Sequence, residues 1–598
     1  MTSTRNIRLA LAAALLVAFA AAGCRPEATA PEAAATPAAG AESELLAAAP
    51  QAEQAITAEA LREPIAVLAR DEYEGRGPGS PGDAKTRQYL IAQMQAIGLQ
   101  PGAGQGSGER GWEQPFAMVG IEGEAPPTWR FAGGGRTVSL KRRDDFVAFP
   151  GKQQPTASVR DAEVVFVGYG IQAPEHQWDD FKAVDLRGKM LLMLNNDPDW
   201  DPQLFAGDRR LYYGRWSYKY ESAARQGAAG AIIIHTTPSA GYPYQVVQTS
   251  WGGEQFELPA TAEPRVDVRA WVTEDGAKQL VGLAGKTLEE LVEAAKKREF
   301  QPMPLGVTTS IDLKATIRQV QTANVLGRLE GGDPELADEV VLFTAHHDHL
   351  GIGDPNAEGD TIYNGALDNA SGCAQVLAVA RAFEALPQPP RRSLLFAFVA
   401  AEEQGLLGSK YLAENPPVPP GKIAGMLNFD GGNIWGKTTD VTFVGMEKSS
   451  LGPLVERLAL EQGRTVVPDQ FPDRGFFYRS DQFSLAKVGV PAIYLDTGTK
   501  FVGQPEGWGK EQIEAWERDH YHQASDELVP EWNFDGLIQD AQLGFRAALH
   551  MAEADEMATW APGDEFEAAR RDAIRAAEGA APTAPAAPSP PAAPSPAQ

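Results

Sequence analysis

From about residue 310 onward, short apolar runs alternate with amphipathic stretches, and this alternation constrains the fold more than any other feature. The runs EVVLFTA, SLLFAFVA, AGMLNF and VPAIYL are typical of buried strands, and SGCAQVLAVARAFEAL and SLGPLVERLALEQG lie between them with helical spacing. Strands interleaved with helices predict an α/β fold, with a mixed, mainly parallel sheet flanked by helices on both faces.

A second region has a different pattern of apolar residues. Residues 119–309 contain shorter strand-like runs, such as AEVVFVGYGI and GAAGAIIIH, separated by Gly and Pro, which predicts a β-rich inserted module. The α/β domain is then expected in two parts, residues 53–118 and 310–560. In the first part, GDAKTRQYLIAQMQAIGLQPG predicts a helix that begins near Asp83 and stops at Gly98. A chain of 598 residues is long enough for several such units.

The first residues indicate export. Residues 1–23 carry Arg5 and Arg8 before a short apolar run and small residues, which is typical of a secretory signal peptide. AAGC at 21–24 resembles a bacterial lipoprotein signal, so we expect lipid on Cys24 and a periplasmic or cell-surface protein anchored to the outer membrane by that lipid only. No later run is long enough to predict a membrane span.

Composition limits the two ends and the partners. Residues 24–52 and 561–598 are rich in Ala and Pro, which predicts a disordered tether and a C-terminal tail. The formal charge of −27 would repel phosphate backbones and excludes nucleic acid as an expected partner. Cys24 and Cys373 are the only cysteines, so no intramolecular disulfide is expected if Cys24 is lipidated.

Acidic and histidine side chains follow the predicted strands. They are His346, His347, Asp348 and His349 after EVVLFTA, Glu402 and Glu403 after SLLFAFVA, Asp430 after AGMLNF, and Asp368 in a loop that enters a helix. Ligands of open α/β sheets bind beyond the carboxyl ends of the strands. Because unpaired buried carboxylates are costly, their convergence predicts a divalent cation.

TAHHDHLG, residues 344–351, holds three histidines within four positions. In an extended chain His346 and Asp348 share one side and His347 and His349 the other, which leaves open which pair faces the site. A ligating imidazole usually donates its second N–H to a carboxylate. Asp348 could orient His346 in this way, which favours His346 as the ligand.

Five sequence motifs resemble, in this order, those of the co-catalytic zinc aminopeptidases of peptidase family M28. They are TAHHDHLG, GALDNASG, FVAAEEQGLLGS, NFDGGN and DHYHQASD. The resemblance covers roughly residues 60–100 and 310–555, and it implies a zinc-peptidase (phosphorylase/hydrolase-like) fold with two Zn²⁺ ions. It makes His346 and Asp430 ligands of one zinc, Glu403 and His522 ligands of the other, and Asp368 the bridge. Asp348 becomes the partner of His346, Glu402 the general base, and Tyr521 a hydrogen-bond donor to the tetrahedral intermediate. It places His347, His349 and His520 outside the ligand set.

The inserted region also resembles a known module. VVFVGYGIQAPEHQWDDFKAVDLRGKMLLML followed by SAARQGAAGAIIIH is similar to a protease-associated (PA) domain, which implies a role in shielding or shaping the entrance to the active site. We expect its His176 and His235 to be surface or packing residues.

These resemblances imply an aminopeptidase that acts on peptides with a free N-terminus. A dizinc carboxypeptidase is the nearest alternative and would need basic residues, such as Arg474 or Arg479, for the substrate carboxylate. A single-zinc glutaminyl cyclase-like enzyme and a receptor-like protein without metals are further alternatives. The motifs specify neither the substrate side chain nor the oligomeric state.

Overall fold

The computed structural model describes residues 44–579, apart from 105–107, 203, 208 and 252. The predicted signal peptide and Cys24 lie outside the described residues. Within the described part, the helices are too short or too polar to cross a bilayer.

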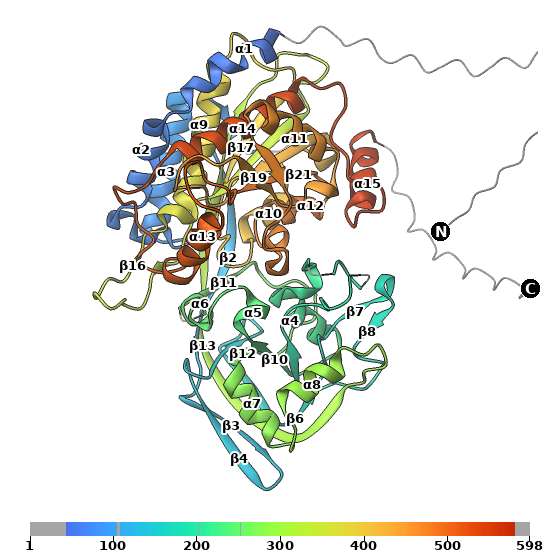
Figure 1. Ribbon diagram of the computed structural model, residues 1–598. Helices are drawn as coiled ribbons and strands as arrows, with labels where there is room; N and C mark the ends of the chain where they lie inside the picture. Colours follow the sequence, from blue (N-terminus) through green and yellow to red (C-terminus); the bar gives the residue numbers. More distant parts are fainter. Residues whose placement is uncertain (1–43, 105–107, 203, 208, 252, 580–598) are drawn as a thin grey trace, which may run out of the picture. The chain divides into compact units, whose positions relative to one another are not determined.

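The sheet of the α/β part has parallel strands at its centre (Figure 1). In spatial order its strands are β13 (Met303–Leu329), β17 (Ser393–Val399), β14 (Val340–His346), β18 (Ile423–Asn428), β21 (Ala492–Asp496), β19 (Asp440–Phe443) and β20 (Thr465–Val467). Strands β17, β14, β18 and β21 run parallel, whereas β13 and β19 pair antiparallel with their neighbours β17 and β21. The predicted mixed, mainly parallel sheet is confirmed.

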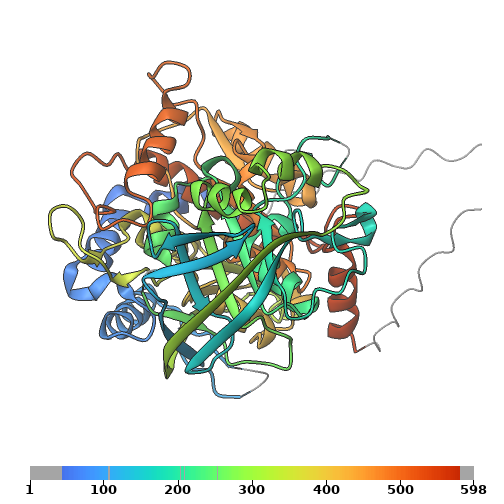
Figure 2. The ribbon, with the colours of Figure 1, turned by 90° about the horizontal axis from the view of Figure 1, so that it is seen from below.

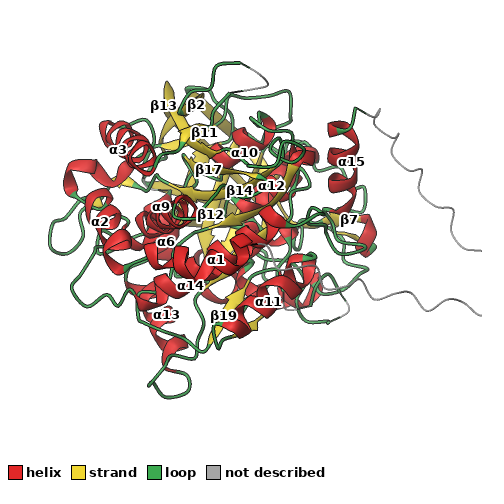
Figure 3. Cartoon of the chain, turned by 90° about the horizontal axis from the view of Figure 1, so that it is seen from above, coloured by secondary structure: helices red, strands yellow, loops and turns green. Residues whose placement is uncertain are grey.

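Helices cover both faces of this sheet. One face carries α2 (Ala58–Leu68), α3 (Pro81–Ile97), α9 (Ser371–Glu384), α11 (Leu451–Glu461) and α14 (Asp535–Glu553), and the other carries α10 (Leu407–Glu414) and α12 (Gln482–Ala486). Alternate residues of β14 pack on the two sides, Val341 and Phe343 with α9 and α14, and Val340 and Leu342 with α10 and α12. Figure 3 shows β14 and β17 between these two groups of helices. A strand buried on both faces explains its continuous apolar sequence.

The insert, residues 119–309, has a sheet of its own. Strands β6 (Thr156–Phe166), β9 (Met190–Leu194), β10 (Gly230–His235) and β12 (Val268–Thr273) run parallel, and β5 (Phe146–Pro150) pairs antiparallel with β12. Helix α4 (Trp216–Arg225) packs on one face, and α7 (Glu274–Gly282) and α8 (Leu288–Ala295) pack on the other. The insert therefore contains helices on both faces as well as the predicted strands.

A long antiparallel ribbon joins the insert to the α/β sheet. The first part of β13 pairs with β6 and with β3 (Thr128–Gly133), which forms a hairpin with β4 (Arg136–Lys141). The middle of β13 pairs with β2 (Glu113–Glu124), and the end of β13 pairs with β17. Figure 2 shows β13 in green alongside the blue and teal strands of the insert. The predicted boundaries at 118/119 and 309/310 fall inside β2 and β13, so continuous strands cross from one region to the other.

The predicted first helix is confirmed with both of its end signals. Helix α3 begins at Pro81, and the hydroxyl of Ser80 accepts a hydrogen bond from the backbone N–H of Asp83 at 3.1 Å. It ends before Gly98, whose φ of 103° is accessible to glycine at low cost.

Both Ala-rich ends differ from the prediction. Residues 44–52 of the predicted tether form α1 (Glu44–Ala52), which buries Leu45, Ala49 and Ala52. These small apolar residues lie on one helical face, and Ala is the strongest helix former. Residues 567–577 of the predicted tail form α15 (Glu567–Ala577), whose buried Arg570 donates to the carbonyl of Ile423 at 2.9 Å.

Candidate metal centre

The ends of three parallel strands deliver side chains to one place, as the topology requires. His346 is the last residue of β14, Glu402 and Glu403 follow β17, and Asp430 follows β18. Asp368 comes from the segment Ala366–Ala370 that precedes α9, and His522 follows α13 (Trp508–Asp519).

A first group of possible metal donors consists of His346, Asp368 and Asp430. The Nε2 atom of His346 lies 3.2 Å from Oδ1 of Asp368 and 3.2 Å from Oδ1 of Asp430. Burial lowers the pKa of the His346 imidazole, but the neighbouring carboxylates, Asp430 first among them, outweigh burial and hold it well above its ordinary value. This imidazole nitrogen therefore faces two carboxylates at once.

A second group lies around Glu403. The Nε2 atom of His522 is 2.9 Å from Oε2 of Glu403 and 3.3 Å from Oδ2 of Asp368. Asp368 thus turns one carboxylate oxygen toward each imidazole. Its position is fixed by Asp526, whose carboxylate accepts the backbone N–H groups of Leu367 at 2.8 Å and of Asp368 at 3.0 Å.

His349 also lies in this second group, although the resemblance to family M28 implied a place outside the ligand set. Its Nδ1 lies 2.7 Å from Oε1 of Glu403, and His349, Asp368 and Glu403 form a possible donor triad. His349 comes three residues after the end of β14, where alternation along a strand no longer tells which way a side chain points. The triple histidine was the signal for it, but spacing could not select it.

The arrangement fits divalent cations. The charge of Asp368 opposes ionisation of Glu403, and the buried Nε2 of His522 makes no hydrogen bond although two carboxylates lie within 3.3 Å. Imidazole nitrogens and carboxylate oxygens that converge in this way are the donor types that bind Zn²⁺ and related divalent ions. Asp368, with one oxygen toward each histidine, is placed to serve two ions.

Asp348 is buried beneath the site and contacts more than its predicted partner. Its carboxylate lies 3.7 Å from Nδ1 of His346, while its backbone carbonyl is closer, at 3.3 Å. The carboxylate accepts the backbone N–H groups of Glu402 at 3.0 Å and Glu403 at 3.3 Å. Asp348 therefore holds the Glu402–Glu403 turn as well as lying beside His346.

Four other histidines lie apart from the two groups. The Nε2 atom of His347 contacts Asp83 of α3 at 3.1 Å, and His520 stacks on Trp516. In the insert, His176 stacks on Phe205, and burial lowers the pKa of His235 to about 4. These four imidazoles lie outside the two donor groups found among the described residues.

Glu402 lies in a small cavity next to the two groups. The cavity has a volume of about 120 Å³, and Glu402, Glu403, Tyr521 and His522 are among its lining residues. Burial raises the pKa of Glu402 well above its ordinary value, although His346 nearby lowers it. A carboxyl group with a raised pKa beside the metal donors is suited to accept and return a proton. Tyr521 stacks on His522 with ring centroids 4.0 Å apart.

The insert contributes directly to this cavity. Ser250, the last residue of α6 (Tyr244–Ser250), places its hydroxyl oxygen 3.0 Å from Nδ1 of His522. If Nε2 of His522 binds a metal, Nδ1 carries the proton and donates to Ser250. Sequence reasoning missed Ser250, because 272 residues separate it from His522 and no motif marks it.

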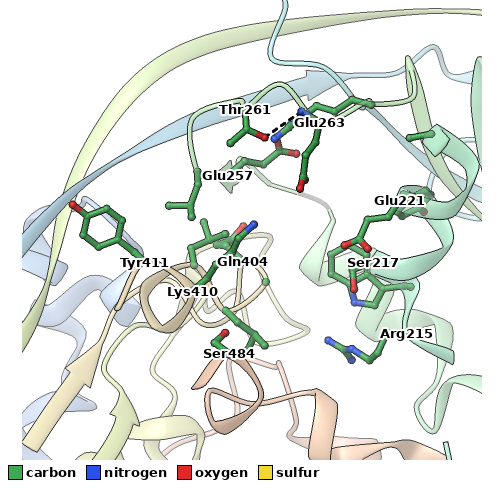
Figure 4. A pocket seen from close by; sticks show the side chains of 18 of the residues that line it. Arg215, Ser217, Glu221, Glu257, Thr261, Glu263, Gln404, Lys410, Tyr411 and Ser484 are labelled. Carbon is green, nitrogen blue, oxygen red and sulfur yellow. Dashed lines mark hydrogen bonds and ion pairs between the residues drawn. The ribbon is translucent and has the colours of Figure 1, made fainter. Parts of the chain in front are cut away.

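A larger chamber of about 600 Å³ adjoins the small cavity. Arg215, Trp216, Gln404, Gly405 and Leu406 line both spaces. Figure 4 shows Arg215, Ser217 and Glu221 from the α4 side of this chamber facing Gln404, Lys410 and Ser484 of the α/β part. Side chains of the insert and of the α/β sheet therefore enclose the site together.

Parts of the chain are similar to known peptidases. Residues 324–545 match the family model described as peptidase family M28. Leupeptin-inactivating enzyme 1 of Streptomyces exfoliatus is 31% identical over 210 residues, which are 34% of this chain and 43% of that protein. A probable zinc metalloprotease of Pyrenophora tritici-repentis is 35% identical over 133 residues, which are 22% of this chain and 25% of that protein. The aligned parts thus span less than half of these relatives.

A solved structure has the same fold. The aminopeptidase from Aneurinibacillus sp. strain AM-1 superimposes with a TM-score of 0.51 and 19% identity, covering 85% of this chain and 97% of that one. This match shows the α/β fold. Together with the family match and the curated relatives, it supports a metallopeptidase.

Proposed function

We propose that this protein is a zinc-dependent aminopeptidase that hydrolyses peptides at a free N-terminus. The observation that carries the proposal is the position of Asp368, whose two carboxylate oxygens face His346 on one side and His522 on the other, at 3.2 and 3.3 Å. In this proposal His346 and Asp430 would hold one Zn²⁺, Glu403 and His522 would hold the other, and Asp368 would contribute to both. His349 then donates from Nδ1 to Oε1 of Glu403 and orients it.

Bound zinc would act as a Lewis acid and make water a nucleophile at neutral pH. Side chains of the protein then transfer the protons and stabilise the developing charge. Glu402 takes a proton from the attacking water and passes it to the leaving amine, a role supported by its raised pKa and by its place in the cavity. Tyr521, which lines the same cavity, donates a hydrogen bond to the oxyanion of the substrate.

The setting of the reaction is part of the same proposal. The N-terminal signal would export the protein and attach it to the outer membrane through lipid on Cys24. The insert, as a PA-like module, would limit access to the site, which is supported by the cavities that it lines. Peptides rather than folded chains would then be the substrates.

One experiment tests the proposed activity. The zinc-loaded protein is given leucine p-nitroanilide and N-acetyl-leucine p-nitroanilide, and zinc is counted in the same sample. We expect hydrolysis of leucine p-nitroanilide, which has a free amine, and no hydrolysis of the N-acetylated compound. Equal rates on both compounds would rule out an aminopeptidase, and an active protein without zinc would rule out the metal site.

A further inference from the structure

Two arginines from different parts of the chain line the small cavity that contains Glu402. Arg215 lies in the insert, at the N-terminus of α4, and Arg479 lies in the α/β part, after the short helix Phe476–Tyr478. Their charges act on each other, since Arg479 contributes to lowering the pKa of Arg215. Burial is the main cause of that shift and brings the pKa of Arg215 to about 10, whereas the pKa of Arg479 is raised, so both guanidinium groups are charged at neutral pH.

Neither guanidinium forms an ion pair with a carboxylate of the described residues. Neighbouring arginines differ in this respect, because Arg474 pairs with Glu517, and Arg269 pairs with Glu257 at 2.6 Å. Of the candidates for binding a carboxylate, Arg474 is therefore already occupied. The charge of Glu402 acts on Arg215 and that of Glu517 acts on Arg479, but neither carboxylate forms an ion pair with these arginines. Two partly buried cations that face one cavity without an ion-paired anion indicate an anionic ligand.

The acids of the cavity do not fill this role. Glu403 is engaged by His349 and His522, which leaves Glu402 as the one carboxylate of the lining set that faces neither histidine group. The lining set carries two guanidinium groups and two carboxylates, but Glu403 is turned toward the histidines, so Glu402 alone remains to balance the two arginines and positive charge is in excess around them. A substrate that brings a carboxylate would compensate it.

The setting of Arg479 suits the recognition of a planar anion. Its guanidinium carbon lies 5.0 Å from the ring centre of Tyr242 and 5.5 Å from that of Phe476, and one Nη atom donates to the carbonyl of Arg474 at 3.4 Å. Aromatic rings hold a guanidinium group in a fixed orientation and leave N–H groups free at its edge. Such an edge binds a carboxylate through parallel hydrogen bonds.

We propose that Arg215 and Arg479 form a subsite that binds a carboxylate of the peptide substrate beside the scissile bond. This inference rests on the proposed peptidase function and specifies its substrate class. The carboxylate is either the α-carboxylate of a dipeptide or an acidic side chain next to the bond. Because Arg215 comes from the insert, the insert contributes to substrate selection as well as to access.

Three matched peptide pairs distinguish the sources of the carboxylate. Ala-Gly and Ala-Gly-amide differ in the α-carboxylate, Ala-Glu-amide and Ala-Gln-amide in the side chain after the bond, and Glu-Gly-amide and Gln-Gly-amide in the side chain before it. We measure kcat/KM for each with the zinc-loaded full chain. At least one carboxylate peptide should exceed its neutral partner by about tenfold or more.

The variants Arg215→Ala and Arg479→Ala test the residues. Each should bring the preferred pair to within about threefold, and Arg479→Lys should keep part of the preference. The ratio within a pair is insensitive to partial unfolding, which lowers both rates equally. Lys410→Gln is the matched control, because Lys410 lines only the larger chamber; it should leave the ratio unchanged.

The outcomes separate the two proposals. If the peptides are cleaved but every wild-type ratio lies within about threefold, the subsite is overturned and the peptidase stands. If Lys410→Gln lowers the kcat/KM ratio of the preferred pair as much as Arg479→Ala does, the preference comes from the overall electrostatic potential of the chamber. This result would also overturn the subsite. If the zinc-loaded protein cleaves no peptide, the proposed function itself fails.

Discussion

Two buried clusters of charged residues, one in the insert and one in the α/β part, differ in how their charges are balanced. In the insert, Nζ of Lys219 donates to the carbonyls of Tyr169 at 2.6 Å and Asn196 at 2.7 Å. Nearby, Nε of Arg210 donates to Oδ1 of Asn196 at 2.6 Å, and Asp197 accepts the N–H of Leu211 at 2.8 Å. Donors therefore meet acceptors within the protein.

The cluster of the α/β part lacks such a balance. Carboxylates of Asp368, Glu403 and Asp430 converge on three imidazoles, and two of these, His349 and His522, have a buried Nε2 atom without a hydrogen-bond partner. Burial is common to both clusters, so it does not identify a functional site. A functional site is identified by charges and hydrogen-bonding atoms that lack partners within the protein, because these specify what a ligand must supply.

The largest effect is expected for Glu402→Gln. Removal of the proton acceptor should lower kcat by about 10² to 10⁴-fold, while zinc per chain stays unchanged because Glu402 is outside both donor groups. Turnover and zinc content are measured on the same sample. Glu414→Gln, at an exposed position of α10, is the matched control. Loss of zinc together with activity would contradict the role of a base that does not bind metal.

A stability change without a metal change is expected for Lys219→Met. Removal of the buried ammonium leaves its carbonyl partners and Asp197 uncompensated, so the free energy of unfolding should fall by about 3 kcal/mol. Denaturant unfolding and zinc content give the two readouts. Lys278→Met, which removes an exposed pair with Glu274, should cost at most about 0.5 kcal/mol. If Lys219→Met left stability unchanged but lost zinc, the two clusters would not differ in the way described.

Ser250→Ala should affect zinc binding from the insert side. Loss of the hydroxyl next to Nδ1 of His522 should weaken binding of one zinc by about tenfold, as is typical for partners of ligating histidines. Competition with a chelator measures this affinity. The neighbouring Thr249→Ala removes a hydroxyl that donates to the carbonyl of Gln245 and should leave zinc affinity unchanged. Equal effects of the two variants would contradict a specific role for Ser250.

The smallest effect is expected for His520→Ala. This imidazole stacks on Trp516 with ring centroids 4.5 Å apart and lies in neither donor group. Its loss should cost at most about 1 kcal/mol of stability and no zinc. If this variant bound one zinc ion fewer per chain, His520 rather than His522 would be the ligand in the second group.

The sequence predicted those parts of the site that follow from strand topology. His346, the Glu402–Glu403 pair and Asp430 all stand at the carboxyl ends of parallel strands, so their convergence could be expected. Ser80, Pro81 and Gly98 likewise marked the ends of α3. Local rules of this kind depend on a few neighbouring residues.

The rest depends on tertiary contacts that local rules do not contain. His349 lies beyond the end of its strand, and Ser250 and Arg215 reach the cavity only because the insert packs there. Composition was misleading at the ends, since the Ala-rich residues 44–52 and 567–577 find apolar or hydrogen-bonding partners and fold as helices. A composition typical of disorder does not exclude packing of a short helix.

The number of bound zinc ions tests the central claim most directly. The full chain is loaded with zinc, dialysed and analysed for metal, beside Asp430→Ala and Asp368→Ala. We predict two ions per chain for the wild type, one for Asp430→Ala and at most one for Asp368→Ala. A wild-type chain that retains no zinc, or a zinc content that neither variant changes, would contradict the account.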